Sequence, residues 1–132
     1  MNKNNYNVSI SLKEQKELLF KDLCARLPYG VKIELTWWVM DEGTCMSTTL
    51  EPDHIEQIRN DELGDVEIKS YLRPMSSMTD EQKKEYNLLR NRVDKELYDT
   101  WKSIDYLNAH HFDYRGLIDK GLAIDATGLN IY

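Results

Sequence analysis

The stretch Val31-Lys-Ile-Glu-Leu-Thr-Trp-Trp-Val-Met40 is the clearest strand pattern in the chain. Its odd-numbered positions are all apolar, whereas its even-numbered positions begin polar and end in Trp38 and Met40. Successive side chains of a strand point to opposite faces, so the odd positions, Trp37 and Val39 included, are predicted to join a core. Trp38 and Met40 then share the other face, where they either pack beneath a helix or form an exposed anchor for a partner.

The residues that follow predict a hairpin and a third strand. Asp41-Glu-Gly-Thr44 is typical of a turn, and the chain is predicted to return from Cys45 to Leu50. Pro52 and Asp53 favour the start of a short helix, and a further strand is predicted from Val66 to Tyr71. These elements make a small antiparallel sheet.

Helices are predicted on both sides of the strands. Ser11-Leu-Lys-Glu14 fits a capping box and begins an amphipathic helix that ends at Pro28. Thr79-Asp-Glu-Gln82 is a second capping box. The helix behind it carries Val93 on its apolar stripe and is predicted to break near residue 100, with Ser103 capping the helix that follows.

Together these elements predict an α+β fold, with an N-terminal helix, a small antiparallel sheet of about three strands and C-terminal helices packed on one face. Residues 1–10 are rich in Asn and lack periodicity, so they are predicted to form a flexible tail. Residues 11–132 are predicted to form a single domain, because a chain of 132 residues has the size of one domain.

Composition and charge narrow the function classes. The chain carries a net charge of −6 with a pI near 5.1, so we expect no direct nucleic-acid binding. It has no apolar run of membrane-spanning length and no signal-peptide pattern, so we expect a cytoplasmic protein without a membrane interaction. Nine acids and one base, Arg59, lie between Asp41 and Glu67. That acidic segment is either a solvated edge or a surface for a basic partner.

Catalytic motifs are missing from the sequence. We find no glycine-rich phosphate loop, nucleophile elbow or paired zinc ligands, and the lack of these motifs favours a protein without enzymatic activity and without a cofactor. In His110-His-Phe-Asp113, adjacent histidines on a helix diverge by about 100° and cannot share one ion. Asp113 is better explained as the cap of a last short helix that stops at Gly121, so no metal site is predicted.

Two arginines beside tyrosines are candidates for binding an anion. Arg73 lies near Tyr71, and Arg115 follows Tyr114. A planar guanidinium beside a phenol ring can hold a carboxylate or a phosphate, but it can equally tie loops together within one domain.

Long ordered strings of residues carry a resemblance to a known family. They are Leu23-Cys-Ala-Arg-Leu-Pro-Tyr-Gly-Val31, Tyr71-Leu-Arg-Pro-Met-Ser-Ser-Met-Thr79, Ile104-Asp-Tyr-Leu-Asn-Ala-His-His-Phe-Asp-Tyr-Arg-Gly-Leu-Ile118 and Lys120-Gly-Leu-Ala-Ile-Asp125. In these strings the chain resembles a family of small uncharacterised proteins found in phages and mobile elements of gut anaerobic bacteria. The resemblance implies such an origin and no particular chemistry.

The sequence therefore predicts a non-enzymatic accessory protein that binds a protein partner through the acidic segment and the face of Trp38 and Met40. The alternative is a protein that binds an anionic, nucleotide-like small molecule through Tyr71, Arg73, Tyr114 and Arg115. A homodimer through the tryptophan face would compete for the same surface.

Overall fold

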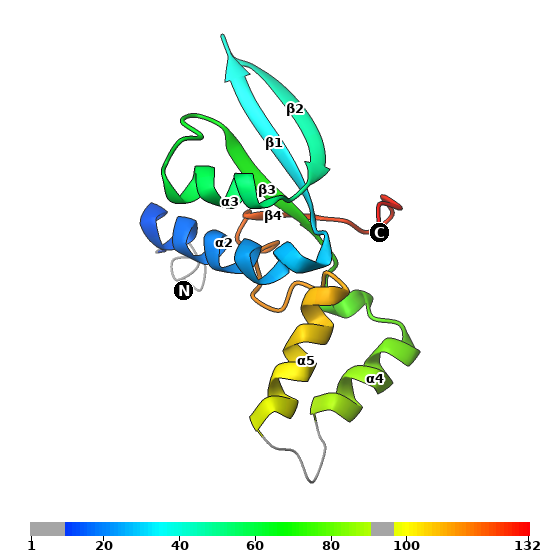
Figure 1. Cartoon of the computed structure of the whole chain (residues 1–132). Helices are drawn as coiled ribbons and strands as arrows, with labels where there is room; N and C mark the ends of the chain where they lie inside the picture. The colour runs from blue at the N-terminus through cyan, green and yellow to red at the C-terminus, as the bar shows by residue number, and fades with distance from the viewer. Residues whose placement is uncertain (1–9, 91–96) are drawn as a thin grey trace, which may run out of the picture.

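The computed structural model describes residues 10–90 and 97–132. In chain order the elements are α2 (Leu12–Arg26), the 3₁₀ turn η1 (Leu27–Tyr29), β1 (Lys32–Val39), β2 (Glu42–Thr49), α3 (Pro52–Arg59), β3 (Glu67–Leu72), the 3₁₀ turn η2 (Met75–Ser77), α4 (Asp80–Arg90), α5 (Leu97–Ala109) and β4 (Ala123–Asp125). The predicted α+β class, with its N-terminal and C-terminal helices, is confirmed (Figure 1). Residues 1–9 of the predicted tail lie outside the described residues.

The sheet has four strands in the order β2-β1-β3-β4. β1 is antiparallel to both β2 and β3, as the sequence predicts. The addition is β4, which pairs parallel to β3, with Ser70 opposite Ala123 and Leu72 opposite Asp125. A strand of three residues is too short to show an alternating pattern, so the sequence analysis missed it.

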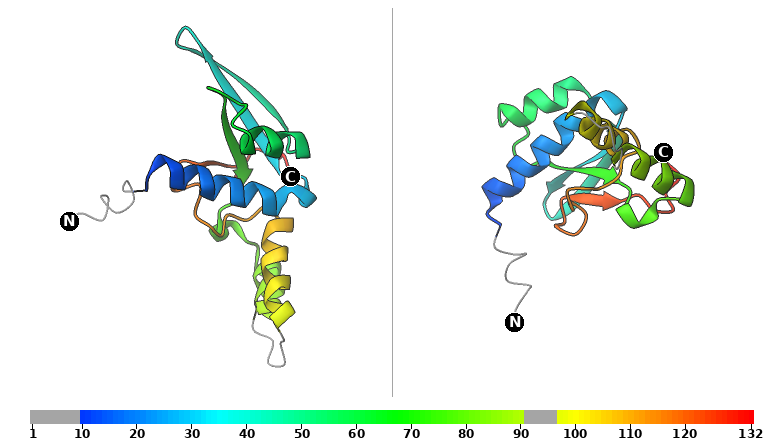
Figure 2. Two further views of the ribbon diagram at one scale, coloured as in Figure 1. Left: turned by 60° about the vertical axis from the view of Figure 1, so that its left-hand side comes forward. Right: turned by 90° about the horizontal axis from the view of Figure 1, so that it is seen from below.

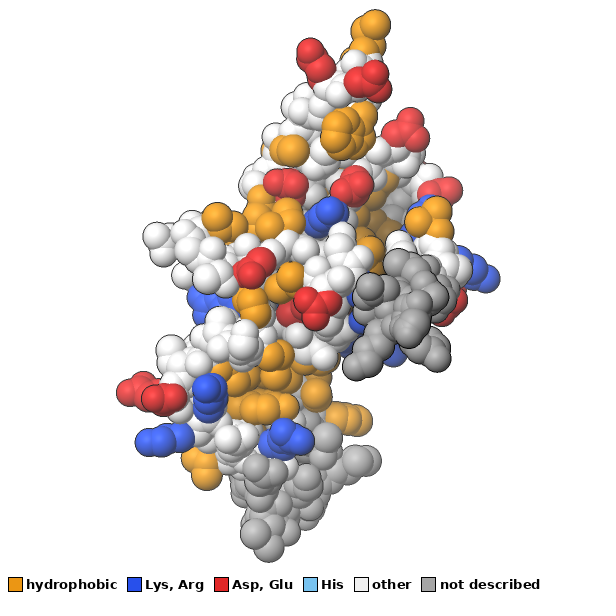
Figure 3. All heavy atoms as spheres, turned by 180° about the vertical axis from the view of Figure 1, so that it is seen from behind, with side chains coloured by type: hydrophobic (Ala, Val, Ile, Leu, Met, Phe, Trp, Pro, Cys, Tyr) orange, Lys and Arg blue, Asp and Glu red, His pale blue; other side chains and the backbone are white. Residues whose placement is uncertain are grey.

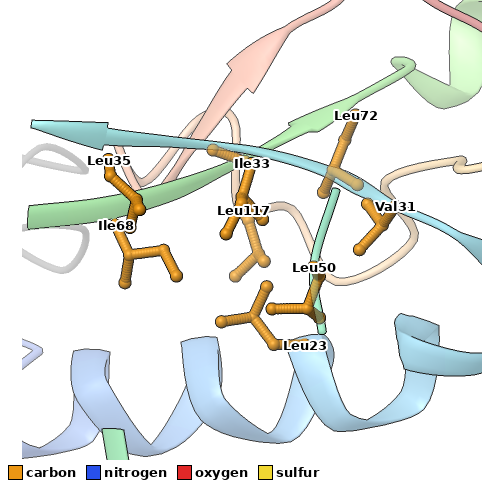
Figure 4. Close-up of a cluster of buried hydrophobic side chains, with 9 residues drawn as sticks. Leu23, Val31, Ile33, Leu35, Leu50, Ile68, Leu72 and Leu117 are labelled. Carbon is orange, nitrogen blue, oxygen red and sulfur yellow. The ribbon is translucent and has the colours of Figure 1, made fainter. Parts of the chain in front are cut away.

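Helices α2 and α3 cover one face of the sheet, whereas α4 and α5 lie side by side and project from its end (Figures 1 and 2). Leu23 from α2 meets Ile33, Leu35 and Ile68 from the sheet in the main core (Figure 4). A second core joins the helical pair to the loops beside it. Its buried members are Met78, Leu107 and Phe112. The chain thus has a sheet layer and a helical projection with separate packing.

The helix starts follow the sequence signals closely. Ser11 Oγ accepts a hydrogen bond of 3.1 Å from the amide of Glu14. Thr79 and Gln82 form the full reciprocal box, at 3.1 Å from the Gln82 amide to Thr79 Oγ1 and 2.9 Å from the Thr79 amide to Gln82 Oε1. The cap predicted at Ser103 is wrong, because α5 runs through this residue and buries it. Val93 lies outside the described residues.

The segment after α5 contains turns instead of the predicted short helix. Asp113 still binds backbone amides, as a cap would: its carboxylate accepts from Leu117 at 2.8 Å and from Ile118 at 2.9 Å. Positive φ angles of 73° at Gly116 and Gly121 bend the chain at both points, which excludes a continuous helix there.

The last residue described, Tyr132, closes the end of the sheet. Its hydroxyl accepts from the amide of Lys32 at 2.8 Å and donates to the carbonyl of Tyr71 at 2.6 Å. This one group therefore satisfies backbone atoms of two neighbouring strands. Among the described residues, no helix has the length and apolar character needed to cross a membrane.

Candidate functional site

The hairpin of β1 and β2 extends beyond the rest of the sheet (Figure 1). β1 pairs with β3 from Ile33 to Thr36, but its pairing with β2 continues as far as Val39 opposite Glu42. The outer part of the hairpin therefore consists of two strands without a third. This explains why the predicted burial of Val39 is wrong: its side chain is 60% exposed, because the core ends where β3 ends.

The tip of the hairpin is a two-residue turn formed by Met40 and Asp41. Both have positive φ angles, 51° and 69°, as a type I′ turn requires. Glycine and asparagine favour such a turn, whereas a methionine there is uncommon. Met40 is 94% exposed, so its side chain gains no packing within the chain that would offset this strain.

Trp38 lies flat across the neighbouring strand. A Cβ atom at Gly43, its partner in the register, would come within 2.8 Å of the Trp38 ring. The absence of a side chain at Gly43 thus leaves room for the indole beside β2, while 58% of Trp38 remains exposed. Trp38 and Met40 are therefore exposed and do not pack beneath a helix among the described residues. We call the exposed side chains of Trp38, Val39 and Met40, at the turn end of the hairpin, the tip patch.

The carboxylates of Asp41 and Glu42 lie beside the tip patch, and the other acids follow along the acidic segment. All nine acids from Asp41 to Glu67 are exposed, and Asp41 and Glu42 lie at the turn itself. Viewed from behind, hydrophobic and acidic side chains lie close together on the projecting hairpin (Figure 3). Glu67 forms an ion pair of 3.4 Å with Lys69 on the same strand. The combination of an apolar anchor and negative charge suits a basic partner surface.

Tyr71 is a structural residue within the sheet. Its side chain is buried, and its hydroxyl donates to Glu34 Oε2 at 3.1 Å and contacts Ser47 Oγ at 2.9 Å. Burial raises the pKa of this phenol above its usual value of 10. The hydroxyl therefore links β1, β2 and β3 rather than facing a ligand.

Arg115 and Tyr114 belong to a buried ionic cluster. Arg115 Nη1 donates to Asp22 Oδ1 at 2.8 Å, and Arg26 Nε donates to Asp22 Oδ2 at 2.8 Å. The side chains of Asp22 and Arg26 are fully buried, and Arg26 Nη2 donates to the carbonyl of Phe112 at 2.7 Å. The Tyr114 ring lies under both guanidinium groups, at 4.7 Å and 5.3 Å. This cluster holds the C-terminal loop to α2.

Sequence reasoning missed Asp22 and Arg26. Their spacing of four residues on one helix is a signal for an ion pair, but such pairs are usually exposed and contribute little. Nothing local indicates that a loop 86 residues further along the chain would cover this one.

Arg73 lies elsewhere, against the C-terminus. Its guanidinium carbon is 5.6 Å from the centre of the Tyr132 ring, and the other neighbour of that ring is His111, stacked at 3.7 Å. Arg73 and Tyr132 line a hollow of about 240 Å³ together with Thr127 and Asn130. Of the four Arg and Tyr residues predicted to bind an anion, Arg73 is the one that lines this hollow.

His110 and His111 both pack against aromatic rings. His110 lies 4.3 Å from the ring of Tyr106, and His111 is buried against Tyr132. Burial, together with the charges of Arg26 and Arg73, lowers the pKa of His111 from 6.5 to about 4. Within residues 10–90 and 97–132, no three His, Cys, Asp or Glu side chains are grouped to hold a metal ion.

A larger groove of about 680 Å³ runs between α2, α3 and the loop before β3. Apolar side chains such as Leu19 and Ile58 lie beside charged ones such as Lys16 and Asp61 in its walls. Sequence reasoning did not find it, because the two helices meet through the fold and not through local spacing.

Comparison with known proteins leaves the chain without an assigned relative. No family model matches it, and neither a curated protein nor a solved structure shows significant similarity.

Proposed function

We propose that this chain is a non-enzymatic accessory protein that binds a basic protein partner through the tip patch. The observation that carries the proposal is the projecting hairpin, in which Trp38 and Met40 are exposed beyond the core. Exposed single hydrophobic residues are common, but a tryptophan and a methionine together at one projecting end are typical of an interface.

The charge around the tip indicates the chemistry of the partner. Asp41 and Glu42 at the turn, with the acids beyond them, would meet lysine or arginine residues at the rim of an apolar pocket. Exposed charges act over about 10 Å at 0.1 M salt, so binding should weaken as salt rises. We propose that the partner belongs to a phage or mobile element or to the cytoplasm of its host, which is the origin that the resemblance in the sequence implies.

The chain offers a matched control for the test. Trp101 on α5 is 64% exposed, close to the value for Trp38, but lies on the helical projection instead of the hairpin. The tagged protein is used to capture partners from the native host, and the captured protein is then purified for affinity measurement. We expect Trp38→Ala to weaken its binding by about 30-fold or more, as loss of a hot-spot residue does, and Trp101→Ala to leave it unchanged.

Binding that survives Trp38→Ala but is lost in Trp101→Ala would place the interface on the helices and overturn the proposal. An affinity that does not change between low and high salt would show that the acidic segment takes no part in the interface. A self-associating chain without any captured partner would favour the homodimer.

A second candidate function is the binding of a small anion at Arg73. Arg73 lines a hollow and, within residues 10–90 and 97–132, forms no ion pair with a carboxylate, in contrast to Arg115. A hollow of about 240 Å³ is smaller than most ligand pockets, so it fits a carboxylate or a phosphate better than a nucleotide. A rise in melting temperature with phosphate that Arg73→Gln abolishes, and Arg90→Gln does not, would support this function.

A further inference from the structure

The outer strand of the hairpin is an open sheet edge. β2 is the first strand in the order β2-β1-β3-β4 and is eight residues long, whereas β4 at the other edge has three. In the part of the chain that the structure describes, the backbone hydrogen bonds made outside helices and strands involve none of Glu42–Thr49. Figure 1 shows β1 on one side of this strand and no helix or strand beyond the other.

The register identifies which backbone groups face outward. In a hairpin with a two-residue turn, the residues that flank the turn, here Val39 and Glu42, form a hydrogen-bonded pair, and such pairs alternate along the strands. The bond of 2.9 Å from the amide of Leu50 to the carbonyl of Val31 falls on the same alternation. The remaining residues of β2 direct both N–H and C=O away from β1. They are Gly43, Cys45, Ser47 and Thr49.

Sheet edges in soluble proteins are usually protected by proline, lysine, bulges or a covering element. Among the described residues β2 has none of these: it contains no proline or lysine, and its side chains from Gly43 to Thr49 are uncharged and small except for Met46. Acids lie at both ends of this neutral stretch, Asp41 and Glu42 before it and Glu51 after it. An incoming strand would therefore pair with neutral residues in its centre and meet negative charge at its two ends.

We propose that β2 receives an extended segment of the partner as a fifth strand, with β-branched or aromatic residues in the middle and Lys or Arg at both ends. This inference rests on the proposed function and specifies how the partner binds. The backbone of the segment pairs with the outward groups of β2, and its side chains on the Trp38 face pack beside the indole over Gly43. Its basic ends meet Asp41 and Glu51.

A second copy of the chain fits this edge less well. If β2 paired antiparallel with its own copy so that the outward residues Gly43 and Thr49 lay opposite each other, Asp41 would lie opposite Glu51 of the other copy. Like charges would then oppose each other at both ends of the pairing, which destabilises a cross-strand pair. Charge complementarity therefore favours a basic segment over self-association.

The test uses the full chain and a displayed library of random ten-residue peptides. We expect enriched peptides to alternate β-branched or aromatic residues and to carry Lys or Arg at both ends. Synthetic peptides of the enriched sequence are then measured by calorimetry against Cys45→Pro and Cys45→Val. Proline at an outward N–H leaves the pairing with β1 intact but removes a donor, so we expect an affinity loss of about tenfold or more. Valine keeps the donor and should bind as the unchanged chain does.

N-methylated peptides keep the test valid if Cys45→Pro does not fold. Methylation of the residues that face β2 should abolish binding, whereas methylation of the alternate residues should not. Peptides without flanking Lys or Arg, or equal binding by both methylated series, would overturn strand addition, as would a lack of enrichment. A dimer that Cys45→Pro converts to a monomer would assign the edge to a second copy and overturn it too. Binding lost in Trp38→Ala but kept in Cys45→Pro would refute strand addition and leave the proposed function standing.

Discussion

Replacing Asp22 by alanine should destabilise the fold more than any other single charge change on α2. The Asp22 carboxylate is fully buried and accepts hydrogen bonds of 2.8 Å from both Arg26 and Arg115. Arg26 is buried as completely, and Arg115 is 19% exposed. Without the carboxylate, the guanidinium of Arg26 would keep its hydrogen bond to the carbonyl of Phe112. Its positive charge would have no counter-charge in the cluster.

The expected cost follows from this burial. Breaking a buried ion pair by removing one partner costs about 3–5 kcal/mol, because the other charge remains without compensation. The free energy of unfolding of domains is about 5–15 kcal/mol, so Asp22→Ala should leave a protein that is folded but only marginally stable. Its melting temperature should fall by about 10–20 °C. Arg115→Ala should cost less, about 1–2 kcal/mol, because Arg26 still neutralises the carboxylate and Arg115 is partly hydrated.

Urea unfolding followed by circular dichroism measures both variants, and Glu17→Ala, an exposed acid on the same helix, is the matched control. In the double variant of Asp22 and Arg115 the two losses should not add, because the residues share one ion pair. A loss below about 1 kcal/mol for Asp22→Ala, or equal effects of Asp22→Ala and Glu17→Ala, would refute the reasoning. It would then favour a role of Arg115 in binding a ligand.

Two further predictions concern the C-terminal contacts. The pKa of His111 is lowered from 6.5 to about 4, so the folded chain binds this proton less readily than the unfolded chain. The free energy of unfolding should therefore fall as the pH drops from about 6.5 to about 4, by at most about 3 kcal/mol. Urea unfolding across this range should show the fall reduced in His111→Asn, a variant that tolerates the positive φ of 64°; identical profiles would contradict the prediction. Tyr132→Phe removes the hydroxyl that bonds Lys32 and Tyr71, and should cost about 1–3 kcal/mol in the same assay at neutral pH. A Tyr29→Phe variant, altered on an exposed tyrosine, serves as its control.

The sequence predicted the elements whose signals are local. Alternation over Val31–Met40 located β1 within one residue at each end, and the caps at Ser11 and Thr79 located the starts of α2 and α4. Alternation also separated the faces of Trp37 and Trp38. Alternation does not show how far β3 extends along β1. Val39 is exposed, although it lies on the core face, because the pairing with β3 stops at Thr36.

The features that sequence reasoning missed depend on contacts between distant residues. The bond between Arg26 and Phe112 joins positions 86 apart, and the bond between Lys32 and Tyr132 joins positions 100 apart. No spacing in the sequence predicts either. A contact between distant residues also decides the role of Arg115. The sequence alone allows Arg115 either to bind a ligand or to hold a loop, and in the structure its partner is the buried Asp22.

The two ends of β1 differ in what their side chains stabilise, and this difference supports an interface at the hairpin. At the N-terminal end of β1, the hydroxyl of Tyr132 accepts a hydrogen bond from the amide of Lys32, and the main core surrounds Ile33. Trp37 is the last residue of the strand to pack against that core, yet the chain continues into a turn that places Met40 at a positive φ. A shorter hairpin with Asn-Gly at its turn would fold with less strain and expose less apolar surface. The projecting tip and the open edge of β2 are therefore not explained by stability of the isolated chain. Both are explained if a partner covers them, because binding would then bury the indole and pair the free backbone groups.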